Sequence, residues 1–148
     1  MLYECFDDIL NVKHGIICHQ VNCKGKMGAG LALDIRKKWP IVYKDYMNAF
    51  KEGELFLGNV ILSTIIEVNL YVVNLCGQYY YGRKGNYTTY TAIRSGLEKI
   101  KKFSIYRGLT VYIPKNMGCG LAGGDWSIVY KIIEEEIPNA IIVRKDMK

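Results

Sequence analysis

The chain has 148 residues, half of them hydrophobic, and a formal net charge of +6. This length is expected to give one domain with one core, over residues 1–148. No stretch reaches the roughly 18 to 20 apolar residues of a membrane span, and the first ten residues lack the pattern of a signal peptide. We therefore expect a cytoplasmic, monomeric protein with no membrane partner.

The excess of basic residues has two interpretations. It could attract an anionic nucleotide or a nucleic acid, or it could simply belong to a lysine-rich soluble surface. The basic residues are scattered, for example over residues 36–38 and 99–102, and do not form a stripe interleaved with aromatic residues. A nucleic-acid polymer is therefore the less favoured partner, because its footprint should cluster on one face.

The five cysteines are an odd number and include no C-x-x-C pair. This pattern does not predict a disulfide framework or a four-cysteine zinc site. Cys5, Cys18 and Cys76 lie in apolar runs and are predicted to be small core residues. Cys23 and Cys119 lie in glycine-rich segments, but no histidine and acid stand at a spacing that predicts a catalytic thiol.

The first half of the chain predicts two strands followed by two helices. The strands are expected over residues 2–6 and 15–21, and the continuous apolar start of the second indicates burial on both faces. A helix is expected over residues 30–38, because the following Trp39-Pro40 pair should end it. Residues 41–51 have apolar and aromatic residues at helical spacing and predict another helix.

Two β-rich runs and a tyrosine-containing loop come next. Residues 59–66 and 68–76 are rich in Val, Ile, Leu and Tyr, and predict neighbouring antiparallel strands. Residues 77–87 are expected to form a loop with three consecutive tyrosines. These tyrosines could stack on a ligand, or they could act in packing or as a lid without stacking.

The rest of the chain alternates helices and strands, expected over residues 89–103, 109–113, 125–137 and 140–143. Thr88 or Thr89 could cap the first of these helices. This alternation along the chain predicts an α/β fold with a mixed, mostly parallel sheet and helices on both faces.

Two glycine-rich segments each follow a predicted strand. GKMGAG occupies residues 25–30 and NMGCGLAGGDW occupies residues 116–126. Glycines can merely form tight turns, but main-chain N–H groups in such loops, together with a helix N-terminus, can also converge on a phosphate. Two such loops at the ends of two strands predict a cleft for a ligand with two phosphates.

The glycine spacing excludes two common nucleotide motifs. Neither loop ends in Gly-Lys-Ser/Thr, as a P-loop does, and GKMGAG has the spacing GxxGxG rather than the GxGxxG of dinucleotide-binding proteins. Nicotinamide redox chemistry is therefore not favoured, and we expect no cofactor and no metal.

Four polar residues near these segments have alternative interpretations. Asp8 could accept a hydrogen bond from an adenine amino group, or could cap a turn. His19 could orient water or act as a general base, or could be a hydrogen-bonded structural histidine. Asn22 offers an amide suited to ribose hydroxyls. Asp125 could be a catalytic acid, but its place before a helix favours an N-cap.

Taken together and in this order, FDDI, HQVNCKGKMGAGLA, NLCGQ and PKNMGCGLAGGDW resemble the macrodomain family. Within it, the chain is most similar to small proteins that process ADP-ribose 1″-phosphate, a branch that includes a yeast phosphatase and the human terminal ADP-ribose protein glycohydrolase. The resemblance implies a three-layer α/β/α sandwich that binds ADP-ribose in a cleft at the strand ends.

The resemblance also implies roles for individual residues. Asp8, flanked by Asp7 and Ile9, matches the aspartate that contacts the adenine amino group. His19 matches the histidine proposed as catalytic in the yeast phosphatase. The residues implied near the distal ribose are Gln20, Val21 and Asn22. The two implied phosphate-binding loops consist of Met27, Gly28, Ala29, Gly30, Leu31 and Ala32, and of Asn116, Met117, Gly118, Cys119, Gly120, Leu121 and Ala122. Met27 could also cover an apolar part of the ligand.

The chain departs from the human glycohydrolase at two positions. Gln78 stands in place of its lysine and Ala122 in place of its catalytic aspartate; Lys84 could substitute only if its loop folds inward. With these departures, the resemblance implies a hydrolase of ADP-ribose 1″-phosphate. The alternatives are a reader that binds ADP-ribose without turnover, and a glycohydrolase that removes ADP-ribose from protein or nucleic acid.

Overall fold

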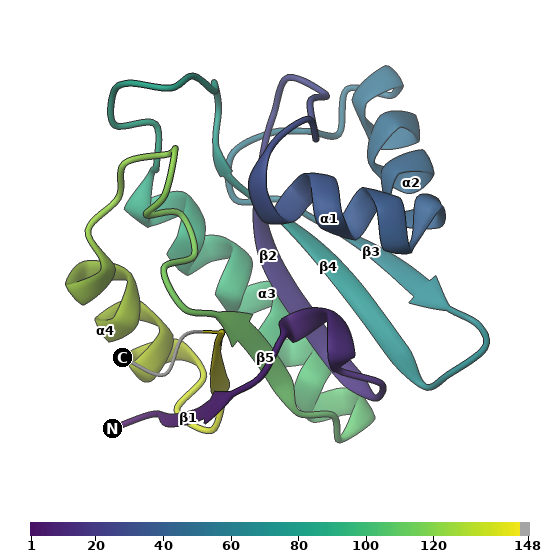
Figure 1. The fold of residues 1–148 in the computed structure, drawn as a ribbon, viewed down its shortest axis with the longest axis vertical. Coiled ribbons are helices and arrows are strands. Elements are labelled where there is room, and N and C mark those ends of the chain that lie inside the picture. The colour runs from purple at the N-terminus through teal and green to yellow at the C-terminus, as the bar shows by residue number, and fades with distance from the viewer. Residues whose placement is uncertain (146–148) are drawn as a thin grey trace.

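The computed structural model describes residues 1–145, and its centre is a six-stranded sheet in the order β1-β6-β5-β2-β4-β3 (Figure 1). The strands are β1 Tyr3–Phe6, β2 Gly15–Asn22, β3 Val60–Ile65, β4 Leu70–Gln78, β5 Val111–Pro114 and β6 Ile141–Arg144. Only the pairing of β3 with β4 is antiparallel among these strands; the other neighbours are parallel. The predicted mixed, mostly parallel sheet is confirmed.

Helices cover both faces of the sheet and give the three-layer α/β/α arrangement that was predicted. They are the 3-10 helix η1 Ile9–Asn11, α1 Gly30–Lys38, α2 Pro40–Lys51, α3 Tyr90–Arg107 and α4 Trp126–Glu136. Helices α1 and α2 pack on one face, and α3 and α4 on the other. Within the described chain, no helix has the length and apolar character needed to cross a membrane.

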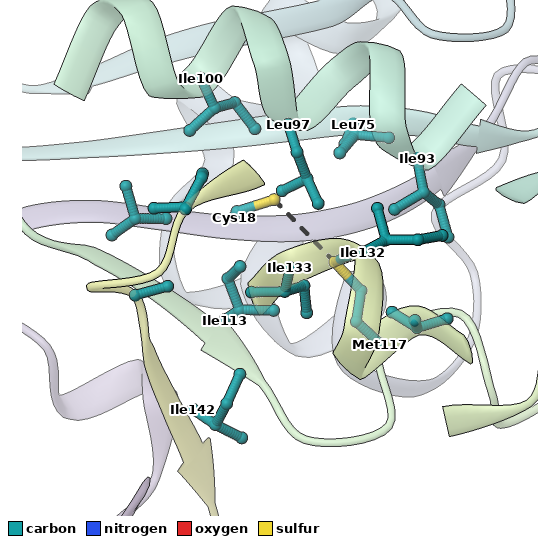
Figure 2. Close-up of a cluster of buried hydrophobic side chains, with 14 of the residues drawn as sticks. Cys18, Leu75, Ile93, Leu97, Ile100, Ile113, Met117, Ile132, Ile133 and Ile142 are labelled. Atoms are coloured by element: carbon teal, nitrogen blue, oxygen red, sulfur yellow. Dashed lines mark hydrogen bonds between the residues drawn. The ribbon is translucent and has the colours of Figure 1, made fainter. Parts of the chain in front are cut away.

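Strand β2 contributes to the cores on both sides, as its continuous apolar run predicted. Ile16 and Cys18 point into the core under α3 and α4, whereas Ile17 and Val21 point into the core under α1 and α2. In the first core, the Cys18 thiol lies 3.9 Å from the sulfur of Met117, which joins the second glycine-rich segment to the sheet (Figure 2). Burial on both faces fixes β2, and with it the residues that follow.

Most element boundaries fall within a few residues of the prediction, and two of the differences matter. Gly77 and Gln78 belong to β4 rather than to the following loop, so Gln78 is held by the sheet. The helix expected over 89–103 continues to Arg107, where Gly108 adopts a left-handed conformation (φ 65°) that ends it. The short helix η1 was not predicted.

One cap and two of the three cysteines predicted for the core agree with the sequence analysis, whereas Cys5, on the edge strand β1, is only half-buried. All five cysteines are free, and Cys18 and Cys76 are buried as expected, together with Cys23. The Asp125 side chain caps α4 by accepting a hydrogen bond from the backbone N–H of Ser127 at 2.9 Å. The interpretation of Asp125 as an N-cap is therefore confirmed.

Candidate functional site

A cavity of about 570 Å³ lies where β2, β4 and β5 end, at the carboxyl edge of the parallel strands. Its walls come from three connecting segments. These are the first glycine loop (residues 25–30), the second glycine loop (residues 116–124) and the segment between β4 and α3 that we name the tyrosine loop (residues 79–87). The two glycine loops therefore face one cavity, as the sequence predicted.

The N-terminus of α1 opens onto this cavity. The N-cap residue Ala29 makes no side-chain capping bond, and Gly30, Leu31 and Ala32 line the cavity wall. The first N–H groups of a helix have no partner within the helix, and they carry partial positive charge. They are therefore available to an anionic ligand in the cavity.

Asn22 holds the first glycine loop in place. Its Oδ1 accepts hydrogen bonds from the backbone N–H groups of Lys24 (3.0 Å) and Lys26 (3.3 Å), and its Nδ2 donates to the carbonyl of Lys26 (2.8 Å). The hydroxyl of Tyr46, from α2, donates to Asn22 Oδ1 at 2.9 Å and to its carbonyl at 2.6 Å. The Oδ1 atom and one Nδ2 hydrogen of the amide expected for ribose hydroxyls are thus used by the loop and by Tyr46.

Thr88 fastens the second glycine loop. Its hydroxyl donates to the carbonyl of Gly118 at 2.5 Å and accepts from Gln20 Nε2 at 3.0 Å. The N–H of Tyr87 donates to the carbonyl of Ala122 at 2.7 Å. The expectation that Thr88 or Thr89 caps α3 through its side chain is wrong: Thr89 is the N-cap without such a bond, and the Thr88 hydroxyl is used here.

Gln20 and Gln78 form the floor between these loops. Gln20 Nε2 also donates to Gln78 Oε1 at 2.9 Å, and Gln78 Nε2 donates to the carbonyl of Tyr80 at 2.9 Å. Gln20 Oε1 is buried and has no partner within the described chain. It lies between Gly77 and Gly118, where a Cβ atom on either glycine would collide with it. Both ends of the Gln78 amide are therefore engaged.

His19 lies at the base of the cavity but is almost fully buried. Its side chain is 2% exposed, and Nε2 lies 2.5 Å from Oδ1 of Asn74 on the neighbouring strand β4. Burial lowers the pKa of His19 to about 4, although the bond to Asn74 opposes the change. The imidazole is therefore neutral near pH 7 and accepts a proton less readily than an exposed histidine.

Most of the predicted site residues line the cavity. They are His19, Gln20, Val21, Asn22, Gly28, Ala29, Gly30, Leu31, Ala32, Asn116, Met117, Gly118, Gly120, Leu121 and Ala122. Five predicted residues do not: Asp7, Asp8, Ile9, Met27 and Cys119. Met27 is 1% exposed and packs in the core under α1 and α2. Its side chain therefore cannot cover a ligand in this conformation.

Asp8 caps η1, which is one of its two predicted roles. Its carboxylate accepts a hydrogen bond from the N–H of Leu10 at 3.0 Å and forms an ion pair with Lys145 at 3.2 Å. The backbone bond, followed by the Lys145 ammonium, lowers the pKa of Asp8 below its usual value. The carboxylate is partly exposed, which leaves it accessible to a further donor.

The cavity also has lining residues that the sequence analysis did not assign: Lys26, Tyr81, Gly82, Arg83, Pro114 and Lys115. Three of them are cationic, and no Asp or Glu is found among the described lining residues. Lys84 does not line the cavity, so the loop does not bring it inward. Of the three tyrosines only Tyr81 lines it, whereas the rings of Tyr79 and Tyr80 lie 5.1 and 5.5 Å from the Lys24 ammonium.

No signal in the sequence distinguished these lining cations from solvated loop residues. Their place depends on how the loops fold over the sheet edge. Within residues 1–145, no group of three or more His, Cys, Asp or Glu side chains is arranged to hold a metal ion.

The family model of the Macro domain matches residues 18–133, which include both glycine loops and the tyrosine loop. The chain belongs to the Macro domain family. A solved structure from Bacteroides thetaiotaomicron, described as a protein of unknown function, is 30% identical, with a TM-score of 0.88 and 97% of each chain covered.

Two further relatives carry functional names. The DarTG protein of Thermosipho africanus, solved in complex with ADP-ribose, has a TM-score of 0.78 at 23% identity, over 95% of this chain and 40% of that one. That likeness shows the fold. The DNA ADP-ribosyl glycohydrolase of Mycobacterium tuberculosis is 34% identical over 53 residues, which are 36% of this macrodomain but only 15% of that relative's length.

Proposed function

We propose that this macrodomain binds ADP-ribose in the cavity between its two glycine loops and hydrolyses ADP-ribose 1″-phosphate. The observation that carries the proposal is the charge of the lining. Lys26, Arg83 and Lys115 line the cavity beside the free N-terminus of α1, and no lining residue described is acidic. A volume of about 570 Å³ falls within the roughly 300–1,000 Å³ common for small-molecule sites.

Different groups of the protein are proposed to bind the diphosphate, the adenine and the reacting phosphate of the ligand. The N-terminus of α1 and the second glycine loop supply main-chain N–H groups to the diphosphate. Asp8, beyond the β5 side of the cavity, is proposed to select adenine. In the reaction, water attacks the phosphorus of the 1″-phosphate and the bond from phosphorus to the anomeric oxygen breaks. The products are ADP-ribose and inorganic phosphate, and the lining cations stabilise the developing charge.

His19 is the proposed catalytic residue, and its environment favours one of its predicted roles. With Asn74 Oδ1 as acceptor, the Nε2 atom of His19 carries the hydrogen, and Nδ1 keeps a free lone pair. Because the pKa of His19 is about 4, the imidazole is a weak general base. We therefore expect His19 to orient the attacking water rather than to remove its proton completely.

Two measurements test this proposal. Calorimetric titration with ADP-ribose should show saturable binding, and incubation with ADP-ribose 1″-phosphate should release phosphate. His19→Ala should reduce the rate, with its melting temperature recorded to exclude unfolding. Absence of heat and of any melting shift at millimolar ADP-ribose would refute the binding site. Binding without turnover of any derivative would instead make the protein a reader of ADP-ribose.

A second candidate is removal of ADP-ribose from nucleic acid, which the 53-residue match to a DNA ADP-ribosyl glycohydrolase favours. The cavity supports it less well. Cleavage of a glycosidic bond commonly uses a carboxylate as base or nucleophile, and the position expected for such a group is occupied by Ala122. The Gln78 amide is bonded to Gln20 and Tyr80 and is not free to act. Release of free ADP-ribose from ADP-ribosylated DNA or protein would establish this activity.

A further inference from the structure

The tyrosine loop forms a third wall of the cavity, at a defined end. Tyr81, Gly82 and Arg83 line the cavity, and the loop follows β4. The helix η1, next to Asp8, packs against β5 instead, and β2 separates β5 from β4 in the sheet. If Asp8 marks the adenine end, as the proposed function requires, the tyrosine loop lies at the end that holds the distal ribose.

The tyrosine loop is fastened to the framework at its base. Gln78 and Thr88 form an antiparallel bridge across it, and the N–H of Thr89 donates to the carbonyl of Gly77 at 2.8 Å. Within the loop, the Tyr87 hydroxyl donates to the carbonyl of Lys84 at 2.5 Å. The returning chain also lies so close to Gly123 that a Cβ atom there would collide with the Gly85 carbonyl. These contacts hold the tyrosine loop, which carries Arg83, against the second glycine loop.

Arg83 differs from every other arginine of the chain. Within residues 1–145, no carboxylate pairs with Arg83 and no aromatic ring lies under its guanidinium. The other arginines have such partners: Arg36 lies over Tyr43 (3.7 Å), Arg94 pairs with Glu135 (2.7 Å), Arg107 lies over Tyr71 (5.2 Å) and Arg144 pairs with Glu4 (3.3 Å). Arg83 is exposed and lines the cavity, and a guanidinium without an internal partner is available to an anion.

We propose that Arg83 recognises an anionic group carried by the anomeric carbon of the distal ribose, as a specificity-determining residue. This inference rests on the proposed function and specifies its substrate class as a phosphate ester. A guanidinium binds phosphate through two parallel hydrogen bonds, a geometry that a point charge cannot reproduce. Lys26 and Lys115 are the other two cations in the lining, and no carboxylate among the described lining residues competes for any of the three.

The test compares two ligands with four proteins. The ligands are ADP-ribose and a non-hydrolysable analogue of ADP-ribose 1″-phosphate in which a methylene group replaces the bridging oxygen. The proteins are the wild type, Arg83→Gln, Arg83→Lys and Lys84→Gln. Lys84→Gln is the matched control, because it removes the same charge from the adjacent position, which does not line the cavity. The measured quantity is the ratio of the two dissociation constants.

The wild type should prefer the phosphonate, and Arg83→Gln should reduce that preference about tenfold or more, as expected for a charged hydrogen bond. Arg83→Lys should retain part of it, and Lys84→Gln should retain all of it. An equal loss in Arg83→Gln and Lys84→Gln, or no loss in either, would overturn the inference. A wild type that binds neither ligand would refute the proposed function itself, so the two failures are distinguishable.

Discussion

Gly118→Ala is the sharpest test of how the second glycine loop is built. Gly118 has φ of 76°, and a Cβ atom there would lie 2.6 Å from Gln20 Oε1 and 3.1 Å from its Cδ. A left-handed conformation costs a non-glycine residue about 1–2 kcal/mol. Moving the buried Gln20 amide would weaken its bonds to Gln78 and Thr88 by about 1 kcal/mol more. We expect a total loss of about 2–3 kcal/mol.

The control for this prediction is Gly120→Ala in the same loop. Gly120 is not in the left-handed region, and its Cβ atom would meet nothing within 4 Å. For a chain of this size, 2–3 kcal/mol corresponds to a fall of about 4–12 °C in melting temperature. Gly120→Ala should melt at or slightly above the wild-type temperature, because alanine restricts the unfolded chain. Thermal unfolding followed by circular dichroism measures the melting temperatures of both variants. Equal melting temperatures for Gly118→Ala and Gly120→Ala would refute the reasoning.

Three further perturbations probe the remaining parts of the site. Tyr46→Phe removes both bonds to Asn22 and should cost about 1–2 kcal/mol in urea unfolding and weaken ADP-ribose binding. Tyr43→Phe is the control: it keeps the contact of its ring with Arg36 and should neither lower the stability nor weaken ADP-ribose binding. The folded-state pKa of His19 is about 4 against an ordinary 6.5, so between these values the unfolded chain binds the extra proton and stability falls as pH falls. The free energy of unfolding should fall by about 2 kcal/mol between pH 7.5 and 5. A His19→Gln variant whose free energy of unfolding depends on pH as steeply as that of the wild type would contradict this. Asp8→Asn should weaken ADP-ribose binding but not binding of the hypoxanthine analogue, which lacks the amino group; equal effects on both would remove Asp8 from adenine recognition.

The elements of the fold were predictable where the signal is local. The apolar run of β2 indicated a central strand because a strand buried on both faces needs no alternation. Helices α1 and α2 followed from 3.6-residue periodicity and the Trp39-Pro40 boundary. Asp125 was identified as a cap because capping involves residues only two or three positions apart.

The side chains of the site were less predictable because their partners are distant in the sequence. Thr88 or Thr89 could have capped α3 through its side chain, yet Thr89 is the N-cap without such a bond and the Thr88 hydroxyl donates to Gly118, thirty residues away. Asn22 was expected near the ribose and lines the cavity, but Tyr46 and the loop use its Oδ1 atom and one Nδ2 hydrogen. Met27 was assigned to the first phosphate-binding loop and could have covered an apolar part of the ligand, yet its side chain packs in the core. Each of these outcomes depends on which polar or apolar group lies nearest in space.

By itself, the sequence determined the order of the elements, the two glycine loops and their place after strands, because periodicity and turn chemistry act over a few residues. Only the tertiary structure decided which side chains face the cavity. Arg83 lines it and Lys84 does not, although the two residues are adjacent. The direction of a loop side chain depends on contacts such as those of Thr88 and Gly123 with distant backbone, and no local pattern encodes them.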